Sequence, residues 1–199
     1  LAEGVHNLTA VQTDKAGNVS DASAALTLTI DLSAESAPGT PDLDASSDLG
    51  ASNTDDYTSD TTPTFGGTGL IEGHKVQVFK DTNSNGVIDS GELLGAATVT
   101  AGGAWSATPT TAMTAGTYTI KANVTDLAGN VSAASTGLTL TIDTSKPVAP
   151  AALTLAPTSD TGVSATDKVT SDTTPTITGT GENGATVTLF RDANNNGLV

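Results

Sequence analysis

The 199-residue chain contains no cysteine, so disulfide bonds and thiolate metal sites are excluded. Aromatic residues are scarce, with one Trp, two Tyr and three Phe, and a core must therefore be built mainly from Val, Leu, Ile and Ala. No apolar run approaches the roughly 18 residues of a membrane-spanning helix, so we expect no membrane insertion in this segment. No segment has a convincing helical periodicity either, which leaves β-strands as the expected regular structure.

Basic residues are also few. Seven Lys and Arg face 22 Asp and Glu, which gives a formal net charge of −15. Nucleic-acid binding needs a basic surface, and we therefore expect no nucleic-acid partner. Self-repulsion at this charge weakens the compact state unless counter-ions bind, and divalent cations are the obvious candidates.

The chain is a tandem array. The segment SDTTPT at 59–64 recurs at 171–176, 112 positions later, and DKAGNVS at 14–20 recurs with one change at 126–132. A period of this length is that of one small domain. Residues 37–145 therefore form one complete repeat, preceded by the C-terminal part of a repeat (1–30) and followed by the N-terminal part of another (146–199). Repetition of a whole module argues for a spacer or a multivalent surface, and against a single active site.

Alternating apolar and polar residues mark the strands of the complete repeat. Residues 116–126 place Ile120, Ala122 and Val124 on one face and Lys121 and Asn123 on the other. This period-2 pattern is typical of half-buried strands. The same pattern predicts strands at 74–81 and 137–143, and weaker candidates lie at 41–45, 62–69, 93–101 and 104–109.

About seven short strands in such a repeat predict an all-β fold of tandem immunoglobulin-like sandwiches. The turn sequences at 126–130 and 101–103 fit hairpin loops, with Gly129 at a positive-φ position. The proline-containing segments 29–41 and 141–152 follow the last strand of a repeat and are typical of short domain junctions. We expect Trp105 to pack in the core rather than to bind sugar.

The whole chain resembles the bacterial Ig-like repeats of large surface adhesins and biofilm-associated proteins. The resemblance rests on the repeated SDTTPT, on GTG at 67–69 and 179–181, on AWS at 104–106, on GTYTIKANVTDLAGNVS at 116–132, and on LTLTID at 26–31 and 138–143. It implies a cell-adhesion and biofilm role at the bacterial surface or outside the cell. It also implies neighbouring repeats as partners and calcium at the junctions between domains.

The segment 81–92, DTNSNGVIDSGE, matches the twelve-position calcium loop of EF-hands. Calcium prefers six to eight oxygen ligands, and this spacing supplies them from one short segment. Strands flank the loop, so we expect a loop within a β-hairpin rather than a helix–loop–helix sensor. The alternative is an Asn- and Gly-rich turn that binds no ion. The predicted ligands are Asp81, Asn83, Asn85, the carbonyl of Val87, Asp89 and Glu92, with Gly86 at the sharp turn.

The following repeat begins the same loop with Asp192, Asn194 and Asn196, and the chain stops before its ninth and twelfth positions, so that site is expected to be incomplete here. Aspartates at the repeat boundaries form a second candidate, whose alternative is a solvated acidic loop. The boundary aspartates are Asp31, Asp42, Asp44, Asp48, Asp55, Asp56, Asp60 and Asp143, and Asp160, Asp167 and Asp172 lie at the positions of Asp48, Asp55 and Asp60.

Three functions remain open. The first is a non-enzymatic, calcium-stabilised spacer of an adhesin whose cell-surface or polysaccharide ligand binds elsewhere in the larger protein. The second is an adhesive module that itself binds a polysaccharide or host surface, which the scarcity of aromatic residues disfavours. The third is an accessory domain of a secreted hydrolase. No nucleophile motif and no carboxylate beside an apolar, aromatic wall indicates a catalytic site within the chain.

Overall fold

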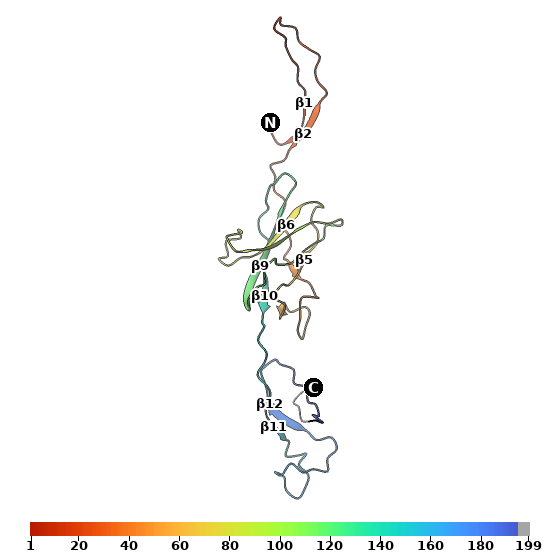
Figure 1. Cartoon of the computed structure of the whole chain (residues 1–199), viewed down its shortest axis with the longest axis vertical. Helices are drawn as coiled ribbons and strands as arrows, with labels where there is room; N and C mark the ends of the chain where they lie inside the picture. Colours follow the sequence, from red (N-terminus) through yellow and green to blue (C-terminus); the bar gives the residue numbers. More distant parts are fainter. Residues whose placement is uncertain (195–199) are drawn as a thin grey trace. The chain divides into compact units, whose positions relative to one another are not determined.

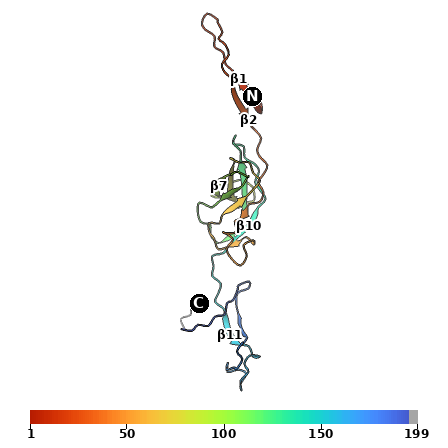
Figure 2. The same ribbon diagram turned by 90° about the vertical axis from the view of Figure 1, so that its right-hand side faces the viewer.

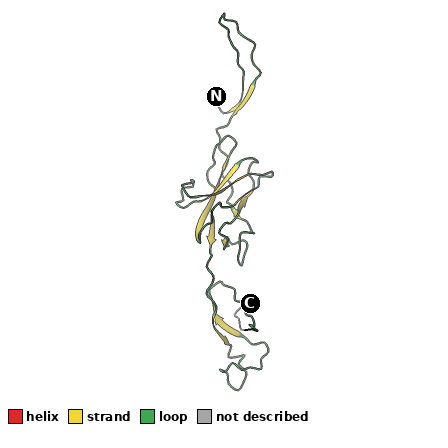
Figure 3. Cartoon of the chain, in the orientation of Figure 1, coloured by secondary structure: helices red, strands yellow, loops and turns green. Residues whose placement is uncertain are grey.

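The computed structural model describes residues 1–194, and in that part of the chain all regular structure is β (Figure 3). It divides into two compact units, Leu1–Thr144 and Ser145–Val199, which we describe separately. The prediction of an all-β fold is confirmed. None of the described residues forms a helix that is long and apolar enough to cross a membrane.

The complete repeat is a two-layer sandwich within the first unit (Figures 1 and 2). One sheet has five strands in the order β4-β10-β9-β6-β7, and the other has three in the order β3-β5-β8. The strands are β3 (Asp42–Leu43), β4 (Tyr57–Thr58), β5 (Phe65–Gly67), β6 (Lys75–Lys80), β7 (Leu93–Thr98), β8 (Trp105–Ala107), β9 (Gly116–Thr125) and β10 (Leu138–Ile142).

Seven of these strands lie within the ranges that alternation predicts, and β4 is the one that it does not. This strand has two residues and pairs in parallel with β10, where Thr141 lies opposite Tyr57. Two residues are too few to show a period. Its position depends on a long connection that brings residues 57–58 to the edge of a strand formed 80 residues later.

The core lies between the two sheets. Phe65 of the three-stranded sheet and Val76, Ile120, Ala122 and Leu140 of the five-stranded sheet are almost fully buried. Burying a side chain of this size contributes about 1.5–3 kcal/mol. The predicted inward face of residues 116–126 is therefore correct, and Lys121 lies on the opposite face, as expected.

Trp105 is part of this core, with 5% of its surface exposed, which confirms its predicted role as a packing residue. It lies opposite Gly67 in the β5–β8 pair. A Cβ added to Gly67 would lie only 2.7–2.9 Å from three atoms of the indole ring. Glycine at position 67 thus provides the room in which the indole ring lies.

The segment after β9 shows how the repeated DxAGNVS sequence folds. Asp126 accepts hydrogen bonds from the backbone N–H groups of Ala128 and Asn130, and Gly129 has a φ of 97°, as predicted. Ser132 then accepts a hydrogen bond from the N–H of Val124 through its hydroxyl, at 3.0 Å. The turn is therefore held by side chains before the regular β9–β10 pairing begins.

The same unit begins with an antiparallel hairpin of β1 (Gly4–Leu8) and β2 (Leu26–Ile30). Its turn repeats the contacts of the complete repeat, since Asp14 accepts from Ala16 and Asn18 at 2.8 Å each. In the second unit, β11 (Ala151–Leu155) pairs with β12 (Ile177–Thr180). These two strands align with β3 and β5, so both partial repeats form the same local pairs as the complete repeat.

Candidate functional site

The loop 81–92 connects β6 to β7 at one end of the five-stranded sheet. The two strands are antiparallel, and the N–H of Lys80 donates to the carbonyl of Glu92 at 3.0 Å. This pairing brings the first and twelfth loop positions together. The predicted flanks are confirmed, because β6 enters the loop and β7 leaves it.

Asp81, the first loop position, has a side chain with no exposed surface. Its Oδ1 accepts from the N–H of Asn85 and its Oδ2 from the N–H of Gly86, each at 3.1 Å. The ammonium of Lys121 lies 2.7 Å from Oδ2. The hydrogen bond from Lys121, aided by the two backbone donors, lowers the pKa of Asp81 below its usual value although burial opposes this.

The middle of the loop is a series of side-chain-capped turns. Asn83 accepts from the N–H of Asn85 at 3.1 Å, and Asn85 accepts from the N–H of Val87 at 2.7 Å. Gly86 has a φ of 69°, so the glycine lies at the sharp turn that the pattern requires. The side-chain amides of Asn83 and Asn85 both donate to Asp89, at 2.8 and 2.9 Å.

Glu92, the twelfth position, closes the loop. One carboxylate oxygen accepts from the N–H and the hydroxyl of Thr82, and the other accepts from the N–H of Asp89 at 3.0 Å. These hydrogen bonds, with that from the Thr82 hydroxyl foremost, lower the pKa of Glu92 despite burial and the nearby charge of Asp81. Glu92 is therefore an anion that joins the start of the loop, at Thr82, to its end, at Asp89.

The predicted ligands are thus brought into one loop, but their side chains are engaged with protein donors. Among residues 1–194, no three His, Asp or Glu side chains are grouped as the ligands of a metal are. The donor set still fits calcium, because it offers three carboxylates, two amides and a carbonyl on a turn framework with glycine at position six. For calcium to bind here, Asp81 would have to give up its contact with Lys121, and Glu92 would have to give up its hydrogen bonds from N–H groups.

Lys121 is the contact of this loop that the sequence did not indicate. It lies 40 residues after Asp81 and was assigned only to the polar face of its strand. The signal that could identify it is the pairing of β6 with β9, which places Lys121 opposite Phe79, two residues before the loop. The beginning of the second loop, Asp192 and Asn194, lies at the end of the described residues, and Asn196 lies outside them.

The boundary aspartates fall into two groups at opposite ends of β9. Asp31 lies near the 126–130 turn, where its carbonyl and that of Ser33 accept from the Asn130 amide at 3.2 and 3.4 Å. Asp143 lies beyond the other end of β9, where its carboxylate accepts from the hydroxyl of Tyr57 at 3.2 Å. The two aspartates that end successive repeats therefore do not meet on the same side of the sandwich.

The Asp143 end contains the denser group. The buried carboxylate of Asp48 accepts through Oδ2 from the N–H groups of Asp55 and Asp56, at 3.1 and 3.3 Å. Burial, and then the negative charges of Asp48, Asp42 and Asp55, raise the pKa of Asp56 above its usual value. Asp44 and Asp60 instead cap local turns, accepting from the N–H groups of Ser46 and Thr62.

The other oxygen of Asp48 is buried and has no hydrogen-bond partner. The same is true of Oδ1 of Asp160, the aligned residue of the following repeat, whose Oδ2 accepts from the N–H of Lys168. A buried carboxylate oxygen without a partner is costly. Its recurrence at aligned positions of two repeats shows that it belongs to the module.

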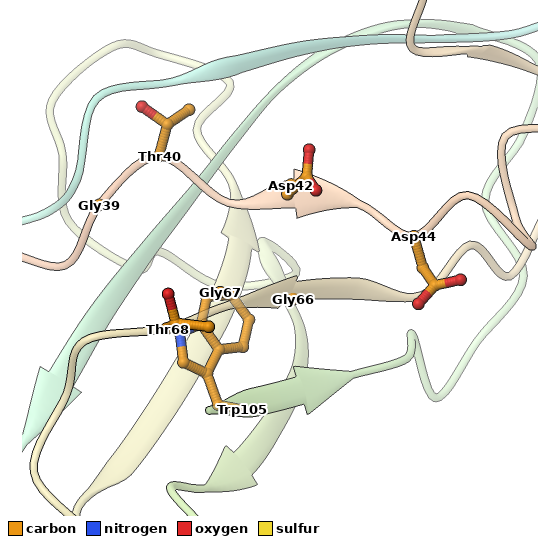
Figure 4. Close-up of a pocket in the computed structure, with 8 residues that line it drawn as sticks. All are labelled: Gly39, Thr40, Asp42, Asp44, Gly66, Gly67, Thr68 and Trp105. Atoms are coloured by element: carbon orange, nitrogen blue, oxygen red, sulfur yellow. The ribbon is translucent and has the colours of Figure 1, made fainter. Parts of the chain in front are cut away.

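A cleft of about 390 Å³ lies over the three-stranded sheet (Figure 4). Asp42, Asp44, Gly66, Thr68 and Trp105 contribute to its lining. Stacking of a sugar on an aromatic ring needs an exposed ring face, whereas the indole of Trp105 packs against Gly67 and is almost fully buried. The cleft does not present an aromatic platform.

Comparison with known proteins identifies the module. The model of the bacterial Ig-like domain family matches residues 35–144 and again residues 147–199. The chain therefore belongs to this family of Ig-like domains.

Among solved structures, the chain is similar to the BSP domain of a biofilm associated protein, with 16% sequence identity and a TM-score of 0.34. The match covers 73% of this chain and 20% of that one, so the chain spans about a fifth of that structure's length. No curated protein matches the chain.

Proposed function

We propose that this member of the bacterial Ig-like domain family is a non-enzymatic, calcium-stabilised spacer of a large bacterial surface or secreted adhesin. The observation that supports a spacer most directly is the succession of two family matches within 199 residues. Modules joined by short segments extend a chain by repetition. The adhesive ligand, on a cell surface or in a biofilm polysaccharide, then binds elsewhere in the larger protein.

The net charge of −15 supports a role for calcium in this spacer, because the folded repeats concentrate carboxylates that repel one another. The loop 81–92 combines Asp81, Asp89 and Glu92 with turns that the backbone already forms around Asp81. Calcium supplied here would neutralise these carboxylates and join the ends of β6 and β7. Asp81, Asn83, Asn85, Val87, Asp89 and Glu92 would hold the ion.

A second ion would lie near Asp48. Its buried Oδ1 lacks a protein partner, and burial together with the charges of Asp48, Asp42 and Asp55 raises the pKa of nearby Asp56. A cation at this place would offset both costs. The recurrence of the unpartnered oxygen at Asp160 supports a site in every repeat. An Asp48→Asn variant should keep the loop site but bind one calcium fewer per complete repeat in equilibrium dialysis.

Mass action sets the size of the effect. Extracellular calcium modules bind with dissociation constants of about 10⁻⁴–10⁻³ M. At a calcium concentration about 100-fold above the constant, one site adds about 2.7 kcal/mol to the free energy of unfolding. This is a large share of the stability of a small domain, which is roughly 5–15 kcal/mol. The repeats would therefore be firmly folded outside the cell and less stable in the calcium-poor cytoplasm.

The test is thermal unfolding of the full chain in calcium and in EDTA. Trp105 is the only tryptophan and lies in the core of the complete repeat, so its fluorescence reports that repeat alone. We expect calcium to raise the unfolding temperature, and an Asp81→Ala, Glu92→Ala variant to lose most of this increase.

An Asp21→Ala, Glu72→Ala variant removes the same two charges at exposed positions outside the loop and serves as the control. It should respond to calcium as the parent chain does. Identical unfolding temperatures of the parent chain in calcium and EDTA would refute the calcium part of the proposal. Loss of the response in both double variants would show that overall charge, and not the loop, is responsible.

A further inference from the structure

The ammonium group of Lys121 lies against the first position of the 81–92 loop. Its Nζ lies 2.7 Å from Oδ2 of Asp81, the first ligand position of the loop. The Asp81 side chain has no exposed surface, and that of Lys121 is 20% exposed. This is a largely buried contact between a carboxylate and a charge of the same sign as calcium.

The sheet, and not the loop, holds this lysine in place. Lys121 is in the middle of β9, paired with Phe79 of β6, and the N–H of Asp81 donates to the carbonyl of Thr119 at 2.9 Å. Its methylene stem also passes close to Gly137, where an added Cβ would lie 3.6 Å from Cε of Lys121. The ammonium therefore stays near Asp81 even if the loop changes its conformation.

Lys121 is the only cation that contacts the three loop carboxylates in the described part of the chain. Glu92 and Asp89 are held by N–H and hydroxyl donors, which carry no net charge. Of the three carboxylates, only that of Asp81 therefore has its negative charge offset by a neighbouring positive charge. That is the residue at which an EF-hand-type loop begins to coordinate its ion.

We propose that Lys121 is a tethered cation that competes with calcium for the 81–92 loop and holds the loop folded when calcium is scarce. This inference rests on the proposed calcium function. The ammonium and the N–H of Gly86 already occupy Oδ2 of Asp81, and the N–H of Asn85 occupies Oδ1, so calcium at this first loop position would compete with Lys121 for the same carboxylate. Lys121 thereby lowers the calcium affinity of the loop and reduces the dependence of the fold on calcium.

The chain itself offers the comparison residue. The position 112 residues before Lys121 is Thr9, in the preceding partial repeat. Threonine thus occurs at this position of the module, which in the complete repeat lies on the face opposite the buried Ile120 and Ala122. Repeats that carry threonine here lack the tethered cation. Their loops should therefore bind calcium more tightly, and their folded state should depend more on calcium.

The experiment compares the full chain with Lys121→Thr and Lys121→Met, the second of which keeps an apolar stem. A positive charge a few ångströms from a divalent ion opposes binding even at the dielectric constant of water, so we expect either change to raise calcium affinity about tenfold. The amide resonance of Gly86 in a ¹⁵N-labelled sample, followed during calcium titration, reports this loop alone. In EDTA, both variants should unfold at a lower temperature than the parent chain, because Asp81 loses its partner.

Two controls separate position from charge. Lys121→Arg keeps the charge and should keep the weaker affinity. Lys75→Thr removes one positive charge at the exposed, far end of β6 and should also leave the affinity unchanged. Equal calcium affinity of the parent chain and both neutral Lys121 variants would overturn the inference while leaving the calcium function standing. If calcium moves the Gly86 resonance in no variant, the proposed loop function itself fails, and the inference fails with it.

Discussion

Substitution of Gly67 by alanine tests the packing that holds the complete repeat together. The added Cβ would lie 2.7 Å from Nε1 and 2.9 Å from both Cε2 and Cζ2 of Trp105, whereas an ordinary contact is 3.4–4 Å. The rigid indole must therefore move by about 0.7 Å or more, or β5 and β8 must separate. Both strands belong to the three-stranded sheet that closes one side of the core.

The expected loss of stability follows from this geometry. Overpacking of a core costs about 1–3 kcal/mol, and three close contacts with one rigid ring place Gly67→Ala near the upper value. Alanine loses less backbone entropy on folding than glycine, which offsets roughly 0.5–1 kcal/mol. A net loss of about 2 kcal/mol remains, and at roughly 4–8 °C per kcal/mol for a domain of this size the unfolding temperature should fall by roughly 8–16 °C.

Fluorescence of the single tryptophan measures the result directly, since the displaced ring is itself the probe. We expect a lower unfolding temperature together with a red-shifted emission of the folded state. Gly39→Ala is the matched control, because an added Cβ there meets no atom within 4 Å and the residue has no positive φ. If Gly67→Ala unfolds at the parent temperature with unchanged emission, the reasoning about this contact is wrong.

Two further predictions concern the turn after β9 and use the same probe. Ser132→Ala leaves the buried N–H of Val124 without its hydroxyl acceptor and should cost about 1–3 kcal/mol in urea unfolding, while Ser20→Ala at the aligned position of the partial repeat should not change the Trp signal. Burial raises the pKa of Asp126, but hydrogen bonds from the side chain and backbone of Asn130 outweigh this and lower it below the usual value. The stability that Asp126 contributes is therefore complete above about pH 4, the pKa of the unfolded chain, and is lost as the pH falls through the lower folded value. Asp126→Asn should accordingly lose less stability than the parent chain between pH 7 and pH 3, and an equal loss in both would contradict this assignment.

The strands of the complete repeat could be predicted because each long one is apolar on one face and polar on the other. In β9, the alternation from Ile120 to Val124 is a local consequence of the two-residue strand period. The parallel partner β4 could not be predicted, because its two residues owe their conformation to β10, far along the chain.

The loop could be recognised for a similar reason, since all six proposed ligands lie within twelve consecutive residues. The electrostatic partner of the loop, Lys121, could not be recognised in this way. Lys121 reaches Asp81 only because β6 and β9 are neighbours, and no spacing within the loop encodes that pairing. The arrangement of the boundary aspartates was likewise decided by the fold. Asp31 and Asp143 end the last strands of successive repeats, and they lie at opposite ends of β9.

The segment LTLTI occurs twice in the chain, at 26–30 and at 138–142, and it separates what each level of structure decides. In both places it forms the second strand of an antiparallel hairpin, and the preceding turn has the same hydrogen bonds to Asp14 and Asp126. By itself, the amino-acid sequence thus determined strands, turns and repeat period, because these depend on residues close in the chain. Burial was decided only by the tertiary structure. Leu140 is completely buried under the opposing sheet, whereas the aligned Leu28 remains 37% exposed, because removing an apolar side chain from water requires a partner surface that no local sequence can supply.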